Sequence, residues 1–192
     1  MVKSLDILLL SNTANLGVNI LSESVVVLAL ILMFIPHIFT TSFAKSSILC
    51  DELKRFFPNT HFNNTGKHLS VSELIDFLED ADAAIIGKEK INDNTLQKAH
   101  RLKIISKYGV GLDSIDEKSL KRRNITLGWT GGINKRSVAE LTLCFMLGLY
   151  RNIFQSGFQL KKTGWEKNGG QLLTEKTIGI IGCGNIGSDV IQ

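Results

Sequence analysis

The sequence predicts an α/β fold built on a parallel sheet. Short apolar segments alternate with helical segments at regular spacing between residues 37 and 130, which is typical of βαβ units. The apolar segments, such as AAIIG at 83–87, have no polar face, and strands buried on both faces belong to parallel sheets. A further apolar segment, followed by a glycine-rich turn at 182–187, indicates that a second, Rossmann-type domain starts near the carboxyl end.

The individual elements follow from periodicity and from helix start signals. Ser70 followed by Glu73 forms a capping-box pattern ahead of an amphipathic segment. Asn92 or Asp93 supplies the cap of a short helix. We expect helices at 46–57, 70–81, 92–100, 114–124 and 137–154, and strands at 37–44, 60–64, 83–87, 102–109, 125–130 and 177–181.

The segment at 137–154, SVAELTLCFMLGLYRNIF, is long and apolar on every side. Ser137 and Glu140 give it a second capping-box start. A helix that is apolar all round is buried. We therefore expect this helix to lie between domains or against another subunit.

The glycine-rich turn matches G-x-G-x-x-G. Gly182 permits a tight turn out of the strand, Gly184 lets a diphosphate approach the backbone, and Gly187 lets the next helix pack closely. The N–H groups of Asn185 and Ile186 open that helix, where the helix dipole favours anions. Because the motif follows a strand signal and precedes a helix start, it predicts a dinucleotide-binding turn.

Composition narrows the classes of partner. The formal net charge of +4 is mild, and there is no dense basic run with interleaved aromatic residues, so a nucleic-acid partner is not expected. Cys50, Cys144 and Cys183 are far apart. They show neither metal-ligand spacing nor a disulfide framework. The sequence therefore predicts no metal site and a reducing, cytoplasmic location.

The amino-terminal residues 1–35 form an unassigned apolar extension. No Asp, Glu, Lys or Arg occurs between Ser24 and Ala44, a length that meets the threshold for a membrane span. Pro36, His37 and the polar TTS at 40–42 interrupt the run, however, and its basic flanks are thin. We therefore do not expect a membrane partner, and keep membrane anchoring through residues 24–44 as the alternative.

Three stretches together resemble the D-isomer-specific 2-hydroxyacid dehydrogenases, within the phosphoglycerate dehydrogenase branch. They are KYGVGLDSID at 107–116, NKRSVAELTL at 134–143 and TIGIIGCGNIG at 177–187. The resemblance covers roughly residues 37–192. It implies a flavodoxin-like substrate domain over 36–133, and a linker helix with the first β–α unit of a Rossmann NAD-binding domain over 134–192. A different Rossmann enzyme, such as a methyltransferase, would fit the glycine motif but not KYGVGLDSID.

The resemblance also implies roles for individual residues. The backbone N–H groups of Val110 and Gly111 would hold the carboxylate of a 2-hydroxy or 2-oxo acid, and Val110 would touch the nicotinamide end of the cofactor. Lys107 would reach anionic groups of the substrate. The glycine-motif residues would bind NAD. NADP is not excluded, because the acidic residue that holds the ribose would lie beyond Gln192.

One position departs from the family pattern. Gly87 stands where some phosphoglycerate enzymes carry an Arg that binds the substrate phosphate, with Lys88 and Lys90 close by. This departure counts against 3-phosphoglycerate as the substrate and leaves another small D-2-hydroxy acid open.

The catalytic Arg, Glu and His of the family follow the glycine motif, so the resemblance carries none of them onto this sequence. The four histidines all precede the motif, at positions that do not match. We therefore assign no catalytic residue and expect a truncated oxidoreductase that is inactive alone. The resemblance also implies a homodimer through the region Ser137–Trp165. The alternative function is that of a non-catalytic fragment that dimerises with an intact homologue.

Overall fold

The computed structural model describes residues 34–162, 164–165 and 169–192, and the chain divides after Gly131 into two compact units. Most of the amino-terminal extension 1–35, and residues 24–33 of the candidate anchor at 24–44, lie outside the described residues. Across the described part of the chain, no helix has both the length and the apolar character that crossing a membrane requires.

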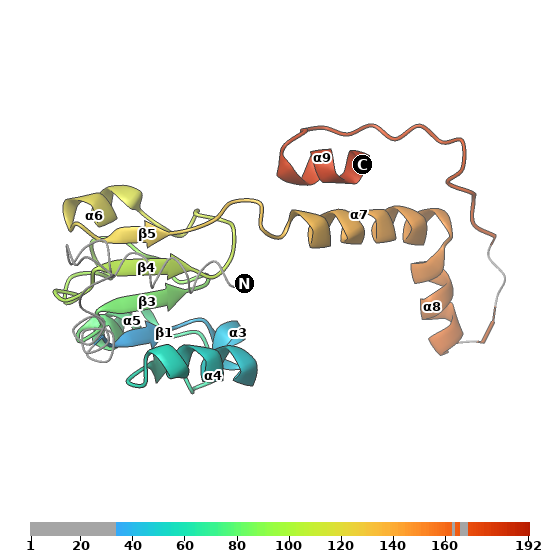
Figure 1. Ribbon diagram of the computed structural model, residues 1–192. Helices are drawn as coiled ribbons and strands as arrows, with labels where there is room; N and C mark the ends of the chain where they lie inside the picture. Colours follow the sequence, from blue (N-terminus) through green and yellow to red (C-terminus); the bar gives the residue numbers. More distant parts are fainter. Residues whose placement is uncertain (1–33, 163, 166–168) are drawn as a thin grey trace. The chain divides into compact units, whose positions relative to one another are not determined.

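The first unit contains a parallel sheet of five strands (Figure 1). The strands are β1 (Pro36–Ile38), β2 (His61–Phe62), β3 (Ala83–Ile86), β4 (Ile104–Lys107) and β5 (Thr126–Gly128). Their spatial order is β2-β1-β3-β4-β5, and every pair is parallel. This order is that of flavodoxin-like folds, so the predicted fold class of this unit is confirmed.

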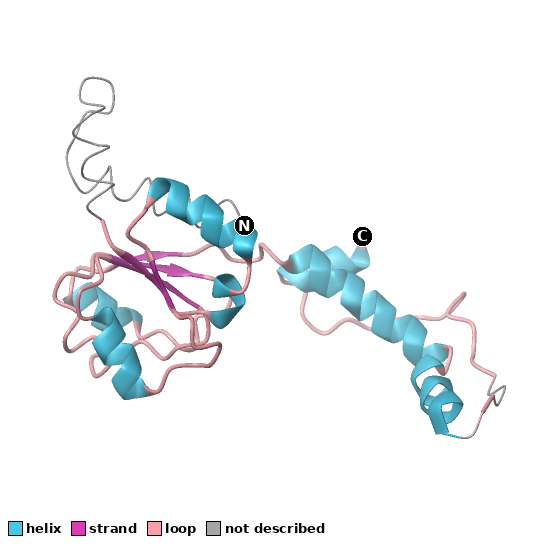
Figure 2. Ribbon diagram, turned by 90° about the horizontal axis from the view of Figure 1, so that it is seen from below, coloured by secondary structure: helices cyan, strands magenta, loops and turns pink. Residues whose placement is uncertain are grey.

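Helices cover both faces of the sheet (Figure 2). Alternate strand residues point to opposite faces, which gives two apolar clusters. On one face α3 (Thr41–Ala44) and α4 (Ser47–Phe56) contribute Phe43, Leu49 and Leu53, which pack with Ile38, Ala83, Ile85 and Ile104. On the other face α5 (Val71–Leu78) and α6 (Glu117–Arg122) contribute Leu74, Leu78 and Leu120, which pack with Phe39, Ala84, Ile86 and Ile105.

The capping box predicted for α5 is present. The Glu73 N–H donates to Ser70 Oγ at 3.4 Å, and the Ser70 N–H donates to Glu73 Oε2 at 2.7 Å. At α6, Asp116 accepts a hydrogen bond from the Lys118 N–H at 3.1 Å. Each helix start therefore satisfies a backbone N–H that has no partner within the helix.

Two predictions in this unit were wrong. The strand predicted at 37–44 ends at Ile38, because the Thr40 carbonyl accepts the N–H groups of Phe43 and Ala44 and starts α3. Residues 92–100 form consecutive turns rather than an α-helix. There Asn92 Oδ1 accepts the Thr95 N–H at 3.1 Å, while Thr95 Oγ1 donates to the Asn92 carbonyl at 3.0 Å. Such side-chain bonds compete with helical backbone bonds.

The second unit contains three helices among its described residues: α7 (Lys135–Tyr150), α8 (Ile153–Lys162) and α9 (Asn185–Ile191). Asn134, not Ser137, occupies the N-cap of α7, and Ser137 Oγ donates to the Asn134 carbonyl at 3.0 Å from inside the helix. Asn152, with φ of 53°, separates α7 from α8, so the single helix predicted at 137–154 was wrong. The buried Asp189 of α9 pairs with Arg136 of α7 at 3.2 Å.

The predicted strand at 177–181 is also absent: the described residues of the second unit contain no strand. Ile178 is 45% exposed and Ile181 is fully exposed. A strand forms when neighbouring strands take up its N–H and C=O groups, and all five described strands lie in the first unit. The apolar pattern is typical of a strand, but the described residues of the second unit contain no other strand with which it could pair.

Within this chain the large apolar side chains of α7 are exposed, and their predicted burial between domains or against another subunit stays a prediction. Large side chains along the helix are 42–68% exposed, namely Leu141, Leu143, Phe145, Leu147 and Leu149. In α8, Phe154, Phe158 and Leu160 are similarly exposed. Contiguous exposed apolar surface of this kind marks interaction sites.

Candidate functional site

A cavity of about 470 Å³ opens in the first unit at the carboxyl ends of the strands. Thr40 follows β1, Gly87 follows β3 and Lys107 ends β4, and all three line it. From β1 the chain continues to β2 on one side, and from β3 it continues to β4 and β5 on the other side, so the direction of strand addition reverses between β1 and β3. In open α/β sheets, ligands bind at such a switch point.

Lys107 stands at the floor of this cavity, with only 7% of its surface exposed. Its Nζ donates to the Gly87 carbonyl and lies 3.5 Å from Ser114 Oγ. Burial lowers the pKa of this ammonium, while the carboxylates of Glu89 and Asp113 act in the opposite direction. The site therefore holds a partly desolvated cation, which attracts an anion more strongly than a solvated lysine does.

Glu89 bonds the backbone N–H of Gly87 and is also buried. Its Oε2 accepts the Gly87 N–H at 2.5 Å, and its Oε1 lies 3.7 Å from Nδ1 of His68, which lines the cavity. Glu89 holds the N–H of Gly87 and Lys107 holds its carbonyl. The sequence analysis did not identify Glu89 or His68 as site residues, and no spacing rule joins either of them to Lys107.

Packing explains the glycine at position 87. A Cβ placed there would lie 2.8 Å from Thr40 Oγ1 and 3.0 Å from Thr40 Cβ. Contacts this short require the neighbour to move. Position 87, where the sequence departs from the family pattern, therefore has no room for a side chain, because Thr40 occupies the adjacent space.

The loop after β4 forms the adjoining wall of the cavity. Gly109 has φ of +134°, a conformation that residues with a side chain rarely adopt. Val110 and Gly111 follow it along the lining, and the Val110 carbonyl accepts a hydrogen bond from Trp129 Nε1 at 3.0 Å. The structure therefore brings Lys107, Val110 and Gly111, the three residues predicted to bind substrate, into one cavity.

The glycine-rich turn lies in the second unit. Gly182 has φ of +94°, Gly184 is the N-cap of α9, and Asn185 and Ile186 are its first residues. A Cβ at Gly187 would collide with the Gly182 carbonyl oxygen, so only glycine lets the helix approach the turn this closely. The local turn and helix start are present, whereas the preceding strand is not.

The fold and the cavity together define an α/β domain with a small polar site at the switch point of a parallel sheet. Residues 41–189 match the family model described as D-isomer specific 2-hydroxyacid dehydrogenase, catalytic domain. Since this match covers most of the chain, the protein belongs to the D-isomer specific 2-hydroxyacid dehydrogenase family.

Individual relatives agree with this assignment. The chain is 36% identical over 131 residues to a hydroxypyruvate reductase of Thermotoga maritima. This alignment covers 67% of the chain and 43% of the reductase. It is 35% identical over 127 residues to a D-3-phosphoglycerate dehydrogenase of Methanocaldococcus jannaschii, covering 65% of the chain and 24% of that enzyme. The chain thus spans less than half the length of these two relatives.

Solved structures show the same fold. The NAD+-bound 3-phosphoglycerate dehydrogenase of Entamoeba histolytica superposes with a TM-score of 0.65 at 25% identity, over 82% of the chain and 49% of that structure. A D-isomer specific 2-hydroxyacid dehydrogenase from Polaromonas gives a TM-score of 0.71 at 22% identity, over 81% of the chain and 50% of that structure.

Gly87→Ala tests the packing of the cavity floor. The added methyl group must displace Thr40 or the backbone at Gly87, which Glu89 and Lys107 hold, and we expect this to cost about 1–3 kcal/mol of unfolding free energy. The midpoint of thermal unfolding, followed by circular dichroism, should fall by about 4 °C or more. Gly179→Ala is the control, because a Cβ there would meet nothing within 4 Å. An unchanged midpoint for Gly87→Ala would show that the floor is not tightly packed.

Proposed function

We propose that the first unit binds the carboxylate of a small 2-hydroxy or 2-oxo acid in the cavity at the strand ends. The observation that carries this proposal is the buried Lys107 ammonium beside the Val110–Gly111 loop. The ammonium supplies charge, and backbone N–H groups in a glycine-rich loop supply directed donors. Together they suit a carboxylate bound at a fixed orientation.

The reaction we propose is reversible hydride transfer between a nicotinamide dinucleotide and this acid. Family membership supports an oxidoreductase. The Gly182–Gly187 turn at the start of α9 supports a diphosphate site, which would use Gly184 and the N–H groups of Asn185 and Ile186. NAD+ is bound in the Entamoeba relative, whereas NADPH is bound in an acyclic imino acid reductase that resembles the chain at 25% identity with a TM-score of 0.67. We propose NAD as the cofactor, with NADP as the alternative.

The cavity favours an acid without a phosphate group. The contact between Gly87 and Thr40 leaves no room for an Arg side chain at position 87. The Thermotoga relative is named a hydroxypyruvate reductase. Hydroxypyruvate carries the carboxylate and the 2-oxo group that the cavity would bind, and we propose it, or its reduced form, as a ligand. We place the reaction in a reducing, cytoplasmic compartment, to which the three free cysteines are suited.

For the chain by itself we propose binding without turnover. A dinucleotide lies across the carboxyl edge of a sheet, and the described residues of the second unit contain no strand. His68 is the histidine that lines the cavity, and its side chain is 68% exposed beside the buried carboxylate of Glu89. We assign it no catalytic role.

Hydroxypyruvate binding to Lys107→Met tests the carboxylate site. A hydrogen bond to a charged group contributes about 1.5–3 kcal/mol, so we expect affinity to fall at least about tenfold. Lys103→Met, an exposed lysine four residues earlier, is the matched control and should bind normally. Isothermal titration calorimetry measures both, and NADH consumption measured in parallel should be absent.

Lys107→Met could also disturb the fold, since Glu89 would lose a nearby cation. Amide chemical shifts of the unmodified protein provide a second measurement. On addition of hydroxypyruvate, the signals of Gly109, Val110 and Gly111 should move more than those of α4. Uniformly unchanged signals, or equal affinity in the two lysine variants, would exclude the proposed site.

A second candidate function rests on the exposed apolar side chains of α7. Leu141, Phe145 and Leu149 recur every four residues and form one stripe along the helix. We propose that this stripe and α8 form a dimer interface within the region Ser137–Trp165, and that the same surface pairs this chain with a longer homologue.

Sedimentation equilibrium tests the dimer. The unmodified chain should sediment as a dimer, and the double variant Leu141→Asp/Phe145→Asp as a monomer, because unpaired charges oppose burial at an interface. Ile48→Asp, on the exposed side of α4, should remain dimeric. An unmodified chain that sediments as a monomer at every concentration would contradict this candidate.

A further inference from the structure

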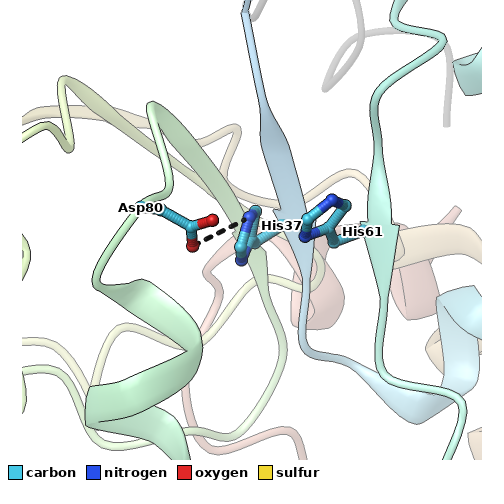
Figure 3. A group of neighbouring side chains, drawn as sticks. All are labelled: His37, His61 and Asp80. Carbon is cyan, nitrogen blue, oxygen red and sulfur yellow. Dashed lines mark ion pairs between the residues drawn. The ribbon is translucent and has the colours of Figure 1, made fainter.

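A cluster of two histidines and an aspartate lies at the amino ends of the strands, at the opposite edge of the sheet from the cavity. His37 is in β1, His61 begins β2, and Asp80 lies in the turn between α5 and β3 (Figure 3). His37 and His61 are register partners in neighbouring strands, with ring centroids 4.6 Å apart. The metal-ligating atoms of the three residues all lie within 4.8 Å of one another.

The protonation of the His37 ring follows from its partner. Nδ1 lies 2.5 Å from the carbonyl oxygen of Phe77, which can only accept, so Nδ1 carries the hydrogen. Burial lowers the pKa of His37 and favours the neutral ring. In a neutral ring protonated at Nδ1, Nε2 carries a lone pair. Backbone carbonyls commonly orient metal-binding histidines in this way.

That lone pair is buried and has no hydrogen-bond partner among the described residues. The His37 side chain is 2% exposed. Nε2 lies 3.6 Å from Oδ1 of Asp80, which is an acceptor as well. Two acceptors that face each other repel unless a donor or a cation lies between them. A cation bound at this point would accept a lone pair from each group and would satisfy the buried Nε2, which has no hydrogen-bond partner among the described residues.

We propose that His37, His61 and Asp80 form a zinc-binding site. Two imidazole nitrogens and one carboxylate oxygen are ligands that Zn²⁺ accepts, with water in a fourth position. Magnesium and calcium instead prefer sets of oxygen ligands.

The geometry needs only a small adjustment to bind the ion. Ligand atoms of a tetrahedral zinc lie about 3.3 Å apart for bond lengths near 2.0–2.1 Å, compared with separations of up to 4.8 Å in the cluster. His61 and Asp80 are both exposed and can rotate, whereas His37 is already fixed. The bound ion would tie the two-residue edge strand β2 to β1 and to the turn before β3.

Zinc titration of the untagged, reduced, full 192-residue chain tests the proposal. Calorimetry with ZnCl₂ should show one ion per chain. His61→Ala and Asp80→Asn should each weaken binding at least about tenfold, and both change exposed side chains, so the fold should persist. His100→Ala, an exposed histidine outside the cluster, is the matched control and should bind as the unmodified chain does.

Two further readouts separate this site from other zinc binding. Zinc should raise the midpoint of thermal unfolding of the unmodified chain and of His100→Ala, but not of His61→Ala or Asp80→Asn. The Co²⁺-loaded protein should show visible absorption of a tetrahedral site without a thiolate charge-transfer band, which excludes the free cysteines as ligands. Absence of saturable zinc binding, or cluster variants that bind zinc as tightly as the unmodified chain, would overturn the proposal.

Discussion

The contact between the Lys107 ammonium and the Gly87 carbonyl organises the functional end of the first unit. It joins the last residue of β4 to the residue that follows β3. Glu89 accepts the N–H of the same residue, so the two peptide units that meet at Gly87 are held by a carboxylate on one side and a cation on the other, both of them buried. Buried charged groups need compensating partners. Lys107 has the Gly87 carbonyl and Glu89 Oε2 has the Gly87 N–H, whereas Glu89 Oε1 has no hydrogen-bond partner among the described residues and lies 3.7 Å from His68.

The two edges of the sheet carry different chemistry. At the carboxyl edge, Lys107 and the glycine-rich loop present donors, which suit an anion. At the amino edge, His37, His61 and Asp80 present acceptors, which suit a cation. Both groups are built on strands of the same sheet, whose apolar side chains are buried beneath helices on the two faces. A stable parallel sheet thus supports both sites without either contributing to the core.

Local patterns predicted the parts of the structure that depend on neighbours in the chain. The alternation of apolar segments gave the parallel sheet, and Ser70 with Glu73 gave the start of α5. The resemblance to a family predicted one substrate site for Lys107, Val110 and Gly111, and all three line the same cavity. The local pattern was misleading at Thr95, because hydrogen bonds between Thr95 and Asn92 form turns where the pattern predicted a helix.

Other features depend on residues distant in the sequence and could not be predicted. Glu89 bonds Gly87 locally, but it comes near Lys107 only because β3 and β4 are adjacent in the sheet. His37 and His61 meet only because β1 pairs with β2. The segment at 177–181 has the pattern of a strand, but its structure depends on a sheet that the described second unit does not contain.

The most direct test of this account is an NMR titration of Lys107 in protein labelled with ¹³C at the lysine Cε. The pKa of Lys107 should lie below the ordinary lysine value of about 10.4, because burial disfavours its charged form. Its signal should also shift when hydroxypyruvate is added, since the carboxylate would bind beside the ammonium. A pKa at or above the ordinary value, together with no response to hydroxypyruvate, would contradict the account.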